Sequence, residues 1–192
     1  VPFIFKLRDN VRSIFDYAFS EMLNNAIEHS ASRNIEVEVS KKDHFLQFRV
    51  RDFGIGVFRS VMKKRHLASE LEAMQDLLKG KTTTAPQAHS GEGIFFTSKT
   101  ADVFILESFG YKMVVDNQIN DVFFRKAPRS KHGTGVTFAI ALATKKRLGD
   151  IFHKFQSVDG DFAFDKTEIR IKLFTIGTIH VSRSQARRVL SG

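Results

Sequence analysis

The 192-residue chain contains no cysteine and no tryptophan, and it has only two tyrosines and three prolines. The lack of cysteine excludes disulfides and thiolate metal ligands and fits a reducing compartment, so we expect a cytoplasmic protein. No apolar run approaches the roughly 18 residues that a membrane-spanning helix needs, and no signal peptide is recognisable, so we expect no membrane partner. The chain begins at Val1 rather than Met, which predicts a fragment of a longer protein or an engineered chain.

Acidic residues are in the minority, because 21 Asp and Glu stand against 30 Lys and Arg and leave a net charge of +9. Such an excess favours an anionic partner, which could be nucleic acid, a phosphate-bearing ligand or an acidic protein, although a merely solvated basic surface is equally open. The densest basic segments are 63–65, 145–147 and 183–188. None is interleaved with the aromatic residues on which single-stranded nucleic acid would stack.

Hydrophobic periodicity predicts an α+β fold, a two-layer sandwich in which helices cover one face of a mixed, mostly antiparallel sheet. Amphipathic helices are predicted over 11–30, where Asp9 or Asn10 could cap the start, and over 145–156. A polar helix carrying Leu67, Leu71 and Leu78 precedes a turn-rich loop at 80–90, and a short helix follows Gly93. Strands are predicted at 3–7, 34–40, 44–50, 102–108, 111–117, 121–127, 135–143 and 168–174, and a last helix at 182–190.

The first long helix, "FSEMLNNAIEHS", carries polar residues at the edge of its apolar stripe. At about 100° per residue, Glu21, Asn25, Glu28 and His29 fall on one flank. An asparagine oxygen suits Mg²⁺, and a glutamate one turn earlier can orient or deprotonate a water or a hydroxyl. The alternative for the helix alone is a solvated flank.

A second polar feature is "RDFGIGVF", in which Asp52 ends an alternating strand and Gly54 and Gly56 follow. An aspartate at a strand end can accept a hydrogen bond from an exocyclic amine, and glycine lets the backbone approach a ligand closely. An ordinary turn would look the same.

Two later segments could contact phosphate. In "HSGEGIFFT", Gly91 and Gly93 precede a short helix whose free N–H groups would suit an anion. "LKGKTTT" is no P-loop, because the first glycine of G-x-x-x-x-G-K-S/T would fall at Gln75, but Lys81 could still reach a phosphate from a lid. In "HGTGVTF", the Thr134 hydroxyl could contact a ring nitrogen or a bridging water.

In order and spacing, these motifs resemble those of the GHKL superfamily, the ATP-binding domains of gyrase-type topoisomerases, Hsp90 chaperones, sensor histidine kinases and MutL proteins. The resemblance covers residues 3–143 and rests on E-x-x-x-N in a helix, D-x-G-x-G after a hairpin strand, G-x-G at the end of a lid, and G-T-x-V-x-F in a late strand. It implies the Bergerat fold, a left-handed βαβ ATP site in which Mg²⁺ bridges the phosphates.

The resemblance also implies a role for each matching residue. Glu21 would be the general base that positions water or a substrate hydroxyl, and Asn25 would be the Mg²⁺ ligand. Asp52 would accept the adenine amine, with Thr134 beside the ring. The other matching positions are glycines that approach adenine or form the lid hinge, and one polar residue that faces the phosphates: Gly54, Gly56, Gly91, Gly93 and His29.

Within the superfamily, "FSEMLNNAIEHS" and "SGEGIFFTSKTADVFILES" are most similar to segments of anti-sigma-factor serine kinases. Phe95 stands where histidine kinases usually carry another glycine, and no segment with an acceptor histidine precedes the domain. We therefore predict a bacterial regulatory kinase or slow ATPase with a regulatory protein partner, and the chain could form a homodimer. The domains would be 1–145, with a lid at 57–90, and 146–192, a linker helix followed by a stretch similar to the opening of a STAS-like domain.

Two other functions remain open from the sequence. ATP could act without hydrolysis as a switch that orders residues 57–90 and sets affinity for a partner. Alternatively, the positive charge could serve nucleic-acid binding, but no recognition helix is visible, so that function would depend on a segment outside this chain.

Overall fold

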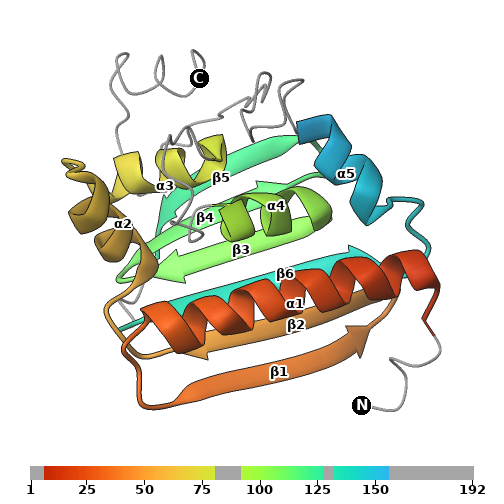
Figure 1. Cartoon of the computed structure of the whole chain (residues 1–192), viewed down its shortest axis with the longest axis horizontal. Helices are drawn as coiled ribbons and strands as arrows, with labels where there is room; N and C mark the ends of the chain where they lie inside the picture. The colour runs from red at the N-terminus through yellow and green to blue at the C-terminus, as the bar shows by residue number, and fades with distance from the viewer. Residues whose placement is uncertain (1–6, 81–91, 128–131, 156–192) are drawn as a thin grey trace.

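One six-stranded sheet, covered by helices on one face, forms the framework of the protein (Figure 1). The computed structural model describes residues 7–80, 92–127 and 132–155. The predicted strand over 3–7 lies almost entirely outside the described residues, as do the loop at 81–90, Gly91 and the elements predicted after residue 156. Among the described residues, no helix is both long enough and apolar enough to cross a membrane.

All strand pairings among the described residues are antiparallel, and the strand order is β1-β2-β6-β3-β4-β5. The last described strand is therefore inserted in the middle of the sheet, between β2 and β3. The α+β class is confirmed. The strands are β1 (Ile35–Lys42), β2 (Phe45–Asp52), β3 (Val103–Ser108), β4 (Tyr111–Asp116), β5 (Asp121–Lys126) and β6 (Thr134–Ala141).

Helix α1 (Asp9–His29) lies over β2 and β6, as Figure 1 shows. Its apolar face is buried because Val11, Ile14, Phe15, Ala18, Met22 and Ala26 recur every three or four residues. The Phe15 ring meets the Phe48 ring of β2 edge-on, with 5.5 Å between the ring centroids. The Phe48 ring stacks on that of Phe138 in β6, with 4.9 Å between the centroids. These aromatic contacts fix the helix against the centre of the sheet.

The predicted side-chain cap of α1 is wrong. The N-cap residue is Arg8, and no side chain accepts a hydrogen bond there. Asn10 instead donates from Nδ2 to the carbonyls of Thr144 and Lys146, both at 2.9 Å. The asparagine thus ties the start of α1 to the chain that leaves β6, a contact between residues far apart in sequence.

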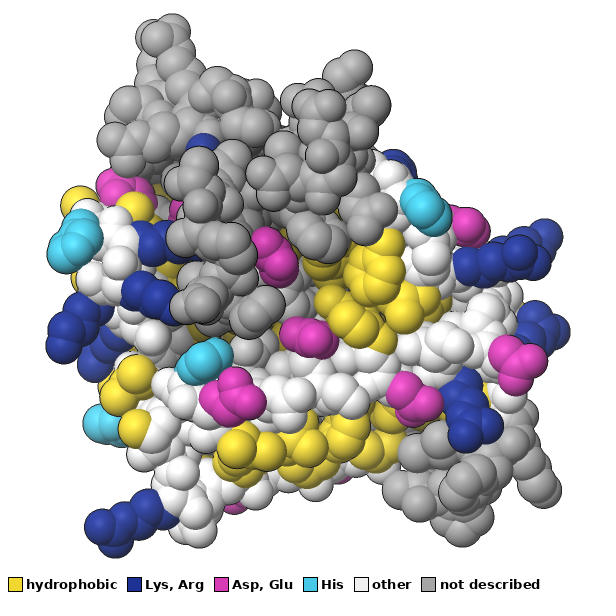
Figure 2. Space-filling model, viewed as in Figure 1, with side chains coloured by type: hydrophobic (Ala, Val, Ile, Leu, Met, Phe, Trp, Pro, Cys, Tyr) yellow, Lys and Arg dark blue, Asp and Glu magenta, His cyan; other side chains and the backbone are white. Residues whose placement is uncertain are grey.

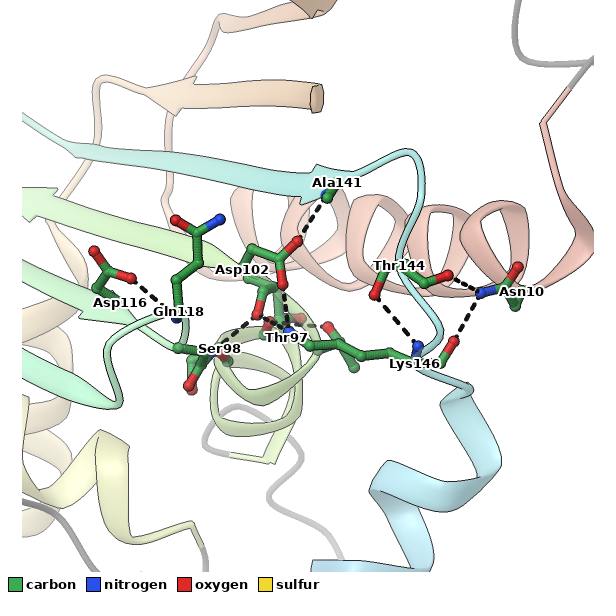
Figure 3. A network of polar contacts seen from close by, with 12 residues as sticks. Asn10, Thr97, Ser98, Asp102, Asp116, Gln118, Ala141, Thr144 and Lys146 are labelled. Carbon is green, nitrogen blue, oxygen red and sulfur yellow. Dashed lines mark hydrogen bonds and ion pairs between the residues drawn. The ribbon is translucent and has the colours of Figure 1, made fainter. Parts of the chain in front are cut away.

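A second polar network stabilises the same region, where the start of α1 lies near the chain that leaves β6 (Figure 3). Lys146 donates from Nζ to Asp102 Oδ1 and to the Ala101 carbonyl, each at 2.7 Å, and Asp102 Oδ2 accepts from the Ala141 amide at 2.7 Å. Asp102 is buried, so its charge needs these partners. The network joins the segment between α4 (Glu92–Thr100) and β3 to the end of β6.

The polar region before the loop contains two helices rather than the single helix that we predicted. α2 (Val57–Arg65) ends at His66, which adopts a left-handed conformation with φ of 52°. α3 (Glu70–Lys79) begins after Ser69, whose Oγ accepts from the Glu72 amide at 3.2 Å while Glu72 Oε2 accepts from the Ala68 amide at 3.1 Å. The S-x-x-E pattern of a capping box was present in the sequence and marks a helix start, although Glu72 accepts from the residue before the cap rather than from Ser69 itself.

Helix α5 (Leu148–Phe155) packs on α4 through a separate aromatic cluster. The Phe152 ring meets Phe96 edge-on, with 4.8 Å between the ring centroids, and Tyr17 of α1 edge-on at a centroid distance of 5.2 Å. The Phe155 ring meets Phe95 edge-on at a centroid distance of 5.5 Å. α5 therefore contacts both α1, which carries Glu21 and Asn25, and α4, which carries Gly93.

Lys99 of α4 lies inside this cluster and gives the first testable prediction. Its Nζ is 5.3 Å from the Phe95 ring centroid and 5.4 Å from that of Phe155. Burial, together with the charge of Lys154, lowers the pKa of Lys99 from 10.5 to about 8. Between these two pH values the unfolded chain binds more protons than the folded one, so the contribution of Lys99 to stability rises with pH.

Urea denaturation at several pH values between 7 and 9.5 measures this effect. We expect the wild type to gain on the order of 1–2 kcal/mol in the free energy of unfolding relative to Lys99→Met as the pH rises. Lys41→Met, on the exposed part of β1, is the control and should follow the wild type. Parallel curves for Lys99→Met and wild type would show that Lys99 titrates normally.

Candidate functional site

A cavity of about 270 Å³ lies between the C-terminal half of α1, helix α2 and the start of β6. Its floor comes from β2, β3 and β6, and its wall includes Ile94 in the first turn of α4. Most of the surface is apolar, with polar groups from α1 and the strand ends. The lining residues that matter below are Asn25, His29, Asp52, Gly56, Lys64 and Thr134.

Asp52 and Thr134 meet at the floor of this cavity although 82 residues separate them in the chain. Because Gly135 of β6 pairs with Arg51 of β2, the end of β2 lies beside the start of β6. Asp52 is only 4% exposed, and its Oδ1 accepts from the Thr134 amide at 3.1 Å and from the Gly54 amide at 2.9 Å. Both contacts fall on Oδ1, which leaves Oδ2 as an acceptor for a ligand.

The Thr134 hydroxyl complements this acceptor. Its Oγ1 accepts a hydrogen bond from the Val57 amide at the start of α2, at 3.0 Å. A hydroxyl that accepts one bond keeps its hydrogen to donate. The floor thus offers one carboxylate acceptor and one hydroxyl donor side by side.

The two glycines of "RDFGIGVF" are required by contacts within the protein. A Cβ on Gly54 would overlap the backbone carbonyl of Ser30, to which the Ile55 amide donates at 2.9 Å. Gly56 has a φ of 79°, and a Cβ there would lie 2.5 Å from the Phe109 ring. The loop after β2 is therefore pressed between the end of α1 and the turn after β3. Gly56 lines the cavity, and Gly54 holds Asp52 through its amide.

Glu21, Asn25 and Gly93 come together where α4 crosses α1. A Cβ on Gly93 would overlap Glu21 Oε2 and would lie 3.7 Å from Asn25 Nδ2, so glycine permits the close approach of the two helices. Asn25 Nδ2 is buried and has no hydrogen-bond partner among the described residues. Asn25 lines the cavity, whereas Glu21 lies behind it at the helix contact.

One turn before Glu21, the Tyr17 phenol is near enough for the charge of that carboxylate to act on it. Burial raises the pKa of Tyr17 above its usual range, and the charges of Glu21 and Glu92 raise it further. The phenol therefore stays neutral near pH 7 and adds no negative charge beside Glu21.

Of the other predicted residues, His29 lies at the rim of the cavity, with Nε2 4.0 Å from Glu28 Oε2. Lys81 and Gly91 lie outside the described residues. The motifs did not reveal the α2 wall of the cavity, which is formed by Val57, Ser60, Val61 and Lys64. Their position directly after D-x-G-x-G was the available signal, since the glycine loop turns α2 back over the strand end.

The side chains that line the cavity fit Mg²⁺ only if a bound ligand supplies further oxygen atoms to the ion. Within the described part of the chain, no group of three or more His, Asp or Glu side chains could hold a metal ion. Mg²⁺ is usually held by one or two protein groups together with phosphate oxygens and waters. The buried amide of Asn25 suits this role, because a half-turn of a carboxamide exchanges its nitrogen and oxygen.

The family model for histidine kinase-, DNA gyrase B- and HSP90-like ATPases matches residues 10–174, and the chain belongs to this family. It is therefore an ATP-binding domain of the GHKL type.

The 43K ATPase domain of Thermus thermophilus gyrase B, solved in complex with an aminocoumarin, is similar to this chain at 22% sequence identity and a TM-score of 0.38. The match covers 79% of this chain and 36% of that one, so the chain spans about a third of the gyrase domain's length. No curated protein matches the sequence.

Proposed function

We propose that the cavity binds ATP with its adenine between Asp52 and Thr134 and its phosphates toward Asn25 and the first turn of α4. The acceptor–donor pair at the floor carries this proposal. Adenine presents an amine hydrogen and a ring-nitrogen lone pair side by side, on two nitrogens bonded to the same ring carbon, and these match Asp52 Oδ2 and the Thr134 hydroxyl. Guanine carries a carbonyl oxygen where adenine has the amine, and that oxygen would face the carboxylate.

The phosphates of ATP would bind near the contact between α1 and α4. Mg²⁺, when bound, would neutralise phosphate charge, and Asn25 would hold it through its amide oxygen. The first N–H groups of a helix have no partner within the helix itself, so the start of α4 suits phosphate oxygens. Glu21, beside Gly93, would align the attacking water or hydroxyl and accept its proton. His29 at the rim, and Lys81 and Gly91 from the lid, complete the proposed set.

The regulatory role is a finer proposal. The similarity of the α1 and α4 segments to anti-sigma-factor serine kinases supports a bacterial kinase or slow ATPase that acts on a regulatory protein partner in the cytoplasm. A homodimer belongs to the same proposal, and so does a stretch similar to the opening of a STAS-like domain that follows the linker helix within residues 146–192. The alternative is a switch that binds ATP without turnover, and nucleic-acid binding would need a segment outside this chain.

Titration calorimetry with and without Mg²⁺, combined with a hydrolysis assay, tests the site and the chemistry separately. We expect Mg²⁺-dependent ATP binding, and we expect Glu21→Gln to keep that affinity while hydrolysis falls about 100-fold or more, because a general base typically contributes this much. Asp16→Asn, at an exposed position on the same helix, is the control and should change neither.

The results separate the alternatives. Wild-type binding without turnover would favour the non-catalytic switch. Turnover that survives in Glu21→Gln would remove Glu21 from the mechanism. A folded wild type that binds no ATP would overturn the proposed site.

A further inference from the structure

Three consecutive basic residues end helix α2, and the structure gives each a different environment. Arg65 pairs with Asp76 of α3 at 2.6 Å, which ties the two helices together. Lys63 is exposed and does not line the cavity. Lys64 is exposed as well, but it lines the cavity. Figure 2 shows the Lys and Arg side chains gathered over α2, at the left of the molecule.

Lys64 supplies an uncompensated positive charge to the cavity wall. Among the lining residues in the described part of the chain it is the only lysine or arginine. Within residues 7–80, 92–127 and 132–155 it has neither an ion pair nor a hydrogen bond. The one carboxylate on the rim, Glu28, lies 4.0 Å from His29 instead.

A second group in the same cavity also lacks a partner. Asn25 Nδ2 is buried and unbonded, and it comes from α1, whereas Lys64 comes from α2. The base-reading pair Asp52 and Thr134 comes from the strand ends at the floor. The helical walls therefore carry a cation and an unsatisfied amide, while the floor carries the pair that suits a purine.

We infer that Lys64, which projects from the α2 wall of the cavity, binds a phosphate oxygen of the bound nucleotide. This contact makes the site bind nucleotides more tightly than nucleosides. This inference rests on the proposed function. Arg65 supports the position of Lys64 indirectly, because the ion pair between Arg65 and Asp76 holds the last turn of α2 in place. A lysine suits the role because its ammonium group is a compact charge on a flexible stem that can follow a phosphate.

A ligand series on matched variants tests this inference. Binding of ATP, ADP, AMP and adenosine is measured by calorimetric titration and displacement for the wild type, Lys64→Met, Lys64→Arg and Lys63→Met. We expect Lys64→Met to weaken ATP about tenfold or more, as loss of a charge-assisted hydrogen bond does, and adenosine less than about twofold. Lys64→Arg should keep most of the ATP affinity, and Lys63→Met all of it.

The dependence of the ATP affinity on salt concentration provides a second measurement, and this measurement does not require adenosine to bind. The affinity of the wild type for ATP should fall more steeply with ionic strength than that of Lys64→Met, because exposed charge pairs are screened. Equal losses for ATP and adenosine, an unchanged ATP affinity in Lys64→Met, or equal effects of Lys63→Met and Lys64→Met would each overturn the role of Lys64. Failure of the wild type to bind ATP would instead overturn the proposed function, and the inference with it.

Discussion

Replacing Asp52 with asparagine is expected to lower the affinity for ATP at least about 100-fold. Asparagine can keep an oxygen toward the Thr134 and Gly54 amides, as Asp52 Oδ1 does now. Its amide nitrogen must then take the place of Oδ2, so two donors would face each other at the adenine amine. The site would lose a charge-assisted hydrogen bond and leave polar groups unpaired in a buried pocket.

Titration calorimetry on Asp52→Asn measures this loss, and urea denaturation checks that the variant is folded. Asp43→Asn is the matched control, because Asp43 lies in the exposed turn between β1 and β2, away from the cavity. It should bind ATP as the wild type does. Unchanged ATP affinity in folded Asp52→Asn would mean that adenine is not read at this carboxylate.

The Asp52–Thr134 pair shows what the sequence could and could not predict. The motifs and their order identified both residues, because an aspartate after an alternating strand and a Gly-Thr turn are local patterns. The hydrogen bond between them depends on β6 entering the sheet beside β2 in a register that pairs Gly135 with Arg51. No local pattern specifies that neighbour, since pairing is decided by which strands share a buried face.

The errors in helix boundaries have two origins, one local and one long-range. The apolar spacing of residues 57–79 suits one helix, and the break comes from His66 in a left-handed conformation and the Ser69 cap. The capping box was readable, whereas the left-handed His66 was not. At the start of α1, Asn10 looked like a cap, yet its amide is engaged by carbonyls about 135 residues away.

Gly54 and Gly56 were predicted to let adenine lie close, and the structure reveals a further constraint. Each already lies against another part of the protein, the Ser30 carbonyl for Gly54 and Phe109 for Gly56. A D-x-G-x-G motif therefore positions its aspartate by packing, before any ligand is considered. Substitution at these glycines should then affect folding as well as binding.

Substitution of Gly54 by alanine is expected to cost about 3 kcal/mol or more of unfolding free energy. The added Cβ would overlap the Ser30 carbonyl, which is backbone at the end of α1 and accepts from the Ile55 amide at 2.9 Å. A backbone atom cannot move aside like the end of a flexible side chain. Relief would have to pull the loop from α1 and break the bond between the Gly54 amide and Asp52.

Gly135→Ala is the matched control, because a Cβ there meets nothing within 4 Å. It should leave stability unchanged or raise it by up to about 1 kcal/mol, since alanine restricts the unfolded chain. Urea denaturation of both variants gives the comparison, and any folded Gly54→Ala should also bind ATP more weakly than Gly135→Ala because Asp52 has lost an anchor. Equal stabilities of the two variants would show that the loop yields easily, and Asp52 would then owe its position to the Thr134 amide rather than to the packing of Gly54 on α1.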